Sequence, residues 1–164
     1  MYKIAFSAAL FACANAVIEE KLAALHGWDY AALNAANGAT APTFEQKDAQ
    51  QFFMMDAQLM FSEPSVPVKG QTLNFHMGGL FMIPAHIDHL NFKCKLDGIP
   101  VYNENFAVNA DAADQWSYVI PFDVPRIAPS SKYDVTFSAI SSDSDSLFEI
   151  ESIFHLWTHL SRPV

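Results

Sequence analysis

The chain has 164 residues, of which 51% are hydrophobic and 14 are phenylalanine. This is enough apolar material for the core of one domain and argues against a disordered chain. The 18 acidic and 9 basic side chains give a formal net charge of −9. Such a charge repels phosphate groups, so the composition argues against nucleic acid as a partner and against polybasic attachment to a membrane surface. No apolar run reaches the roughly 18–20 residues of a transmembrane segment.

The N-terminus has the pattern of a secretory signal peptide. Lys3 precedes a run of apolar and small residues from Ile4 to Ala14, and Ala14-Asn15-Ala16 fits the small-x-small cleavage pattern. We therefore expect residues 1–16 to be removed and the protein to enter the secretory pathway, reaching the extracellular space or the endolysosomal lumen. A retained buried helix and a mitochondrial presequence are the alternatives.

The segment that follows predicts a short helical extension. Apolar residues recur at Ile18, Leu22 and Leu25 at helical spacing, and Asn37-Gly38 is a typical helix end. We expect residues 17–44 to form this extension and a linker, and residues 45–164 to form the main domain.

After about residue 50 the pattern changes to short apolar runs separated by turn residues, which is typical of strands. Asp97-Gly98 predicts a tight hairpin, and the serine-rich Ser141–Ser146 predicts a second hairpin loop. Seven strands at this spacing predict an all-β fold, an antiparallel β-sandwich. The predicted strands are Phe52–Phe61, Gln71–Met77, Leu90–Leu96, Ile99–Tyr102, Trp116–Phe122, Tyr133–Ile140 and Leu147–Trp157.

Four histidines occur as two pairs, and they are the candidate metal ligands. His86 and His89 flank Asp88, and His155 and His159 form the second pair. A metal site needs three or four converging ligands, whereas His86 and His89 would point to opposite faces of a strand. We expect exposed loop histidines here and no metal site.

The sequence lacks the motifs that usually surround a catalytic nucleophile or a phosphate-binding loop. No Gly-x-Ser-x-Gly motif occurs, and Gly78-Gly79 lies at a predicted strand end, not between a strand and a helix. Cys94 falls on the apolar face of its strand, which predicts an inert core thiol. We therefore expect a protein without catalytic residues or cofactors.

A series of short motifs between about Gln51 and Leu160 resembles the ML lipid-recognition family, which includes the Niemann–Pick sterol carrier and phosphatidylglycerol/phosphatidylinositol transfer proteins. The order and spacing of the motifs carry the resemblance, since none is specific alone. The motifs are Lys69-Gly70-Gln71-Thr72, Leu96-Asp97-Gly98-Ile99-Pro100-Val101, Ser117-Tyr118-Val119-Ile120-Pro121-Phe122, Pro129-Ser130-Ser131-Lys132-Tyr133 with Val135-Thr136-Phe137, and Ser146-Leu147-Phe148 with His159-Leu160.

The resemblance implies an immunoglobulin-like sandwich that holds a sterol or acyl chains between its two sheets, without enzymatic activity. By position in the family motifs, the implied lipid-binding residues are Ile120, Pro121 and Phe122 on one strand and Phe137 on the neighbouring strand. Because proline cannot donate a hydrogen bond to the sheet, we expect a bulge or an edge position at Pro121. Strand alternation, and not the family motif, adds Phe75, Phe148 and Ile150.

The chain departs from the family in its cysteines. Family members usually have a disulfide cysteine directly after Ser-Leu-Phe, and Glu149 occupies that position here. Cleavage after Ala16 would leave Cys94 as the only thiol, so no internal bridge could form. Each missing bridge costs about 2–5 kcal/mol, which a filled core would partly compensate.

Two functional hypotheses follow. The first is a soluble, non-enzymatic carrier of a sterol or phospholipid. The second is a structural or interaction module with a filled core, whose N-terminal helix binds protein partners in a larger assembly. A lipid-presenting accessory to an enzyme or receptor is a third, weaker hypothesis. A cavity of several hundred Å³ would favour the carrier, and a packed interior would favour the module.

The signal-peptide prediction is tested by the intact mass of the protein purified from its native source. We expect the mature chain to begin at Val17, directly after the Ala14-Asn15-Ala16 pattern. A mature chain that begins at Met1 or Tyr2 would contradict secretion and favour the assembly module.

Overall fold

A computed structural model describes residues 39–48 and 52–156 of the chain. The expected signal peptide, the expected helix over residues 17–37 and His159 lie outside the described residues. Within them, no helix has the length and apolar character required to cross a membrane.

Seven strands and one short 3₁₀ helix make up the described fold, and every strand pairing is antiparallel. The strands are β1 (Thr43–Gln46), β2 (Phe53–Met55), β3 (Phe61–Glu63), β4 (Thr72–Leu96), β5 (Ile99–Asp123), β6 (Lys132–Ser141) and β7 (Ser146–His155), and the 3₁₀ helix is η1 (Ala57–Leu59).

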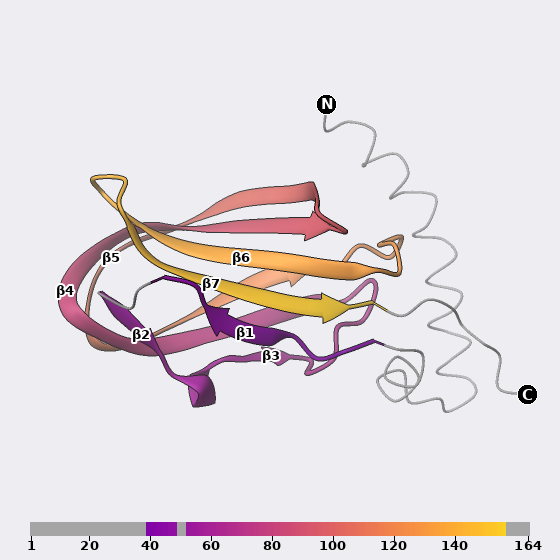
Figure 1. Cartoon of the computed structure of the whole chain (residues 1–164), viewed down its shortest axis with the longest axis horizontal. Helices are drawn as coiled ribbons and strands as arrows, with labels where there is room; N and C mark the ends of the chain where they lie inside the picture. The colour runs from indigo at the N-terminus through magenta and orange to yellow at the C-terminus, as the bar shows by residue number, and fades with distance from the viewer. Residues whose placement is uncertain (1–38, 49–51, 157–164) are drawn as a thin grey trace, which may run out of the picture.

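Two layers arise because the long strands β4 and β5 run side by side through both of them and bend between the layers (Figure 1). The second half of β4 also pairs with β6, which pairs with β7, which pairs with β1; we call this layer A. The first half of β4 pairs with β2 and β3 along one side and with the second half of β5 along the other; we call this layer B. The predicted antiparallel β-sandwich is confirmed.

Irregularities at the bend of β4 keep apolar side chains on the core side in both layers. Pairing with β5 is interrupted between Phe81 and Ala85 and again between Ile87 and His89. Against β6, β4 has one extra residue between Ile87 and His89, and this changes which alternate residues of β4 face the core. Odd-numbered residues from Leu73 to Phe81, and Ile87 after the bend, are buried, whereas from Leu90 to Cys94 the even-numbered residues are buried.

The predicted hairpins are confirmed by backbone geometry. Asp97 and Gly98 have φ values of 47° and 83°, as a tight turn between twisted strands requires. In the β6–β7 loop, the Ser141 N–H donates to the Asp145 carbonyl at 2.9 Å, and Ser144 has a φ of 68°.

The predicted strand boundaries are wrong in three places. Four predicted strands are halves of β4 and β5, because near the bend neither strand alternates: β5 is polar and alanine-rich there, and β4 has the apolar run Leu80–Ile83. Pairing between the two strands nevertheless resumes at Ala85. The predicted strand Phe52–Phe61 is divided into β2, η1 and β3. Sheet structure also begins at Thr43, within the expected linker and two residues before the expected domain start, because β1 pairs with β7.

The core lies between the layers and is dominated by aromatic rings. Six phenylalanines have almost no exposed surface: Phe53, Phe75, Phe92, Phe137, Phe148 and Phe154. Phe75 of layer B contacts Phe137 of layer A with ring centroids 5.0 Å apart, and Phe53 stacks on Phe148 at 4.3 Å. Rings from the two layers therefore contact one another directly in the core.

The prediction that Cys94 is a core thiol is confirmed. Its side chain is buried, and desolvation, with a smaller contribution from the charge of Asp134, raises the pKa of the thiol to about 12. The thiol therefore stays protonated at neutral pH, and it is the thiolate that reacts with electrophiles.

We expect Cys94 to resist alkylation by iodoacetamide at pH 8 in the folded protein and to react fully in denaturant. A chain carrying Cys13→Ser isolates the reaction of Cys94, which mass spectrometry then measures. Reducing agent should leave the unfolding midpoint of this chain unchanged, because a single cysteine cannot form an internal disulfide. Rapid alkylation of the folded chain would contradict the burial of Cys94.

Candidate functional site

The residues predicted to bind lipid lie in the sandwich interior, with one exception. Six of the seven are buried: Phe75, Ile120, Phe122, Phe137, Phe148 and Ile150. Pro121 is exposed. Pro121 pairs in register with Asn74, so its side chain points away from the core, on the opposite face of β5 to Ile120 and Phe122.

The structure places Phe137 at the centre of the interior. Val135, Phe137 and Ala139 are fully buried on β6, as their alternation predicts. The Phe137 ring lies 5.0 Å from that of Phe75 and 5.3 Å from that of Phe92, measured between centroids. The interior around Phe137 is therefore occupied by neighbouring rings.

The other predicted residues reach this centre from elsewhere than expected. Ile120 and Phe122 belong to the layer B half of β5 and approach from the opposite layer, not from a strand next to β6. Phe122 joins the cluster through Phe92, at 5.2 Å between ring centroids. Phe148 belongs to a second ring cluster, in which it contacts Phe53. No bulge occurs at Pro121, and the alternative expectation, an edge position, is met because β5 pairs with β4 alone among the strands of residues 39–48 and 52–156.

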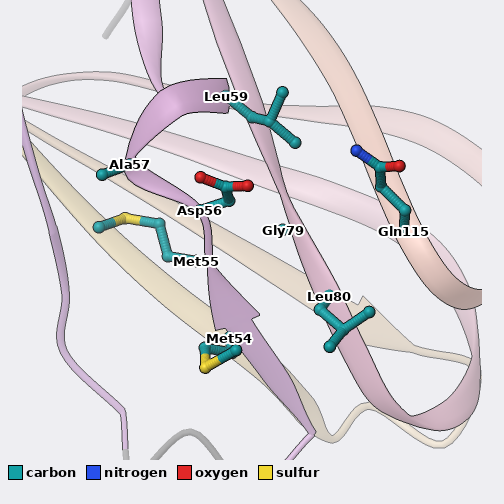
Figure 2. Close-up of a pocket in the computed structure, with 8 residues that line it drawn as sticks. All are labelled: Met54, Met55, Asp56, Ala57, Leu59, Gly79, Leu80 and Gln115. Carbon is teal, nitrogen blue, oxygen red and sulfur yellow. The ribbon is translucent and has the colours of Figure 1, made fainter.

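A pocket of about 470 Å³ lies on the outer face of layer B, away from the predicted site (Figure 2). Its wall is mostly apolar and comes from β2, η1, β4 and β5. The residues that line it are Met54, Met55, Asp56, Ala57, Leu59, Gly79, Leu80 and Gln115. Sequence reasoning missed this pocket, since it assigned Met54 to Leu59 to a continuous strand.

Two glycines allow the turn around η1 to lie directly on β4. A Cβ atom on Gly78 would lie 2.7 Å from Leu59 Cβ, and one on Gly79 would overlap the Met54 carbonyl oxygen and the Phe53 ring. Gly78-Gly79 therefore lies inside β4 and not at a strand end, and its lack of side chains lets β2 and η1 approach. A glycine pair within an alternating strand is the sequence signal that could have indicated this close approach.

Asp56 turns the chain at the pocket and supplies one of its two polar side chains. Its Oδ1 accepts a hydrogen bond from the Gln58 N–H at 2.9 Å and thereby caps η1. Its own N–H donates to the Gly78 carbonyl at 3.0 Å. The second polar side chain, that of Gln115, lies on the β5 side of the pocket (Figure 2).

The three candidate histidines that the structure describes, His86, His89 and His155, are strand residues, which corrects the expectation of loop positions. His86 and His89 both lie on β4, and His86 Nδ1 is 2.7 Å from Asp111 Oδ1 on β5. This hydrogen bond raises the pKa of His86 above its usual value. His89 Nδ1 is 2.7 Å from Asp88 Oδ2, while His155 ends β7. Over the described ranges, no three His, Cys, Asp or Glu side chains are grouped so that they could hold a metal ion.

Comparison with known proteins gives similar folds at low sequence identity. The chain matches no protein-family model and no curated protein sequence. A Niemann-Pick type C2 protein from Japanese carpenter ant is 11% identical over 68% of this chain and 96% of its own, with a TM-score of 0.48.

Two further solved structures are similar to about the same degree. Chicken MD-1, solved in complex with lipid IVa, is 13% identical over 70% of this chain and 88% of its own, with a TM-score of 0.42. The C-terminal domain of wzt is 17% identical over 77% of this chain and 85% of its own, with a TM-score of 0.43. The Niemann-Pick protein and MD-1 are ML proteins, the family that the sequence motifs resemble. At these TM-scores the ligand must be argued from the residues of this chain.

The packing around Phe137 generates a stability prediction. Phe137→Ala should lower the free energy of unfolding by about 3–5 kcal/mol, because it leaves a cavity among the Phe75 and Phe92 rings. Urea denaturation measures the change, and the exposed Val119→Ala is the control, with an expected effect within about 0.5 kcal/mol. A loss below about 1 kcal/mol for Phe137→Ala would show that the interior is not filled there.

Proposed function

We propose that this protein is a non-enzymatic lipid-binding protein that holds the apolar part of its ligand in the outer pocket of layer B. The observation that carries the proposal is the pocket itself. Its volume of about 470 Å³ lies within the range of about 300–1,000 Å³ that is typical of ligand sites. Its combination of an apolar wall with two polar side chains suits an amphipathic ligand.

The pocket would bind by removing apolar ligand surface from water. Each methylene group buried against Met54, Met55 and Leu80 contributes about 0.8 kcal/mol. Methionine side chains adapt to the shape of such ligands. Asp56 and Gln115 would contact the polar headgroup at the rim, where a cationic or hydrogen-bonding group would be favoured.

The space between the two layers is the alternative position for the same class of ligand, a sterol or acyl chains. There the ligand would contact Phe75, Ile120, Phe122 and Phe137, all of which lie in the interior. These side chains now contact their neighbours, so a ligand would have to separate the layers or rotate the rings. The outer pocket requires no such rearrangement, and we therefore favour it.

The packed interior supports a second candidate function, an interaction module without a lipid ligand. The sandwich would then be a stable scaffold that presents its surfaces to protein partners. In either case we propose a location in the secretory pathway, extracellular or endolysosomal, which rests on the signal-peptide pattern at residues 1–16.

The proposal is tested by lipid extraction and native mass spectrometry of the purified protein, followed by titration of the delipidated protein with the methyl ester of the fluorescent fatty acid cis-parinaric acid, whose headgroup is uncharged. We expect saturable binding that Leu80→Gln weakens about tenfold, because the substitution places a polar group in the apolar wall. Val119→Ser, on the same face outside the pocket, is the matched control and should bind as the unmodified chain does.

The outcomes separate the candidates. Equal binding by the unmodified chain and Leu80→Gln would show that the ligand binds outside the pocket and would favour the position between the layers. No copurifying lipid and no saturable binding of the fatty-acid ester would reject the lipid-binding proposal and favour the interaction module.

A further inference from the structure

The outer faces of the two layers differ in chemistry. Along layer A the outward side chains of β4, β6 and β7 are mainly charged or polar, as expected for a sheet face in water. They include the ion pairs Lys47–Glu151 at 3.0 Å and Lys132–Asp134 at 2.9 Å. The large apolar side chains that this end of the layer exposes, Ile99, Val101 and Tyr102, lie close to the tip of the β4–β5 hairpin.

Layer B instead presents apolar side chains outward. Phe61 and Val119 flank His76 in one cross-strand row and are 47% and 44% exposed. Exposed Met54 and Leu80 form another row, where the pocket lies. These side chains stay exposed although Phe61 stacks on His76, and contiguous apolar surface of this kind marks interaction sites.

The charges on this outer face are all of one sign. Asp56, Glu63 and Asp123 lie on it, and no lysine or arginine occurs in Phe53–Glu63, Thr72–Phe92 or Ile99–Asp123. Lys69 and Arg126, the nearest cations along the chain, belong to the loops beyond the strand ends, where Lys69 Nζ lies 2.8 Å from Ser130 Oγ and Arg126 packs against Gly70. His76 stacks on Phe61 at 4.2 Å and is 3.6 Å from Glu63 Oε2.

We propose that the outer face of layer B docks an amphipathic segment of a partner protein, with an apolar stripe flanked by lysine or arginine. The carboxylates of the face would attract the cations of the partner, and the exposed side chains of Phe61, Val119 and Leu80 would contact its apolar stripe. The dimensions also fit. Thr72 to Phe81 spans about 33 Å and three strands span about 14 Å, while a helix of about 20 residues is about 30 Å long and 10–12 Å wide.

The same charges disfavour the other occupants of such a surface. A second copy of the chain would bring the carboxylates of two identical faces together, and an anionic lipid surface would be repelled. The docking proposal goes beyond lipid binding and does not depend on it, because Phe61, Glu63, Val119 and Asp123 lie outside the pocket.

The test uses the full chain and an 18-residue helical model peptide of leucine and lysine, with its leucine–glutamate counterpart as the control peptide. Isothermal titration should show binding of the lysine peptide alone, weakening as salt rises. Val119→Ser, at an exposed position that should not affect folding, should weaken binding about tenfold. Glu63→Gln with Asp123→Asn should weaken binding and reduce its salt dependence.

A matched charge control shows where the peptide binds. Asp143→Asn with Asp145→Asn removes two charges from the exposed β6–β7 loop and should leave affinity nearly unchanged. Equal losses for the two charge-removed variants would show non-specific attraction to an acidic protein and overturn the proposal. So would binding of the glutamate peptide, self-association of the unmodified chain that Val119→Ser abolishes, or sedimentation with phosphatidylcholine vesicles that Val119→Ser abolishes.

Discussion

The fold depends on one constraint: β4 must present apolar side chains to the core on both sides of its bend. The strand crosses from layer B to layer A, so a regular alternation through the bend would not bury the apolar side chains of both halves. In its pairing with β6, β4 has one extra residue between Ile87 and His89, which shifts the alternation by one and returns Leu90, Phe92 and Cys94 to the interior. Because β5 and β6 pair with β4, their registers follow from the same adjustment.

The aromatic interior follows from this arrangement and decides where a ligand can bind without rearrangement. Phe75 meets Phe137 directly between the layers, so the space that the family resemblance assigns to lipid is occupied by side chains. The chain lacks the cysteine expected after Ser-Leu-Phe, and Glu149 occupies that position. A filled core and a missing disulfide are physically consistent, since packing can supply stability that a cross-link otherwise provides.

The outer face of layer B combines close backbone approach with unusual surface chemistry. Gly78 and Gly79 bring β2 and η1 onto β4, which creates the pocket beside Leu80. The rest of the face exposes Phe61 and Val119 among carboxylates. Lipid binding in the pocket and docking of a basic amphipathic segment would use adjoining parts of one surface, so an occupant of either part would influence the other.

Local residue patterns were sufficient to predict the antiparallel β-sandwich, the Asp97-Gly98 hairpin and the burial of Phe75, Cys94 and Phe137, because alternation and turn chemistry are properties of neighbouring residues. They could not show that separate apolar runs belong to the single strands β4 and β5, since backbone pairing continues where side-chain alternation stops. They could not place the pocket, whose wall joins β2, η1, β4 and β5, segments that are distant along the chain. Whether the interior is filled or hollow was decided only by tertiary structure, because it depends on how rings from opposite layers meet.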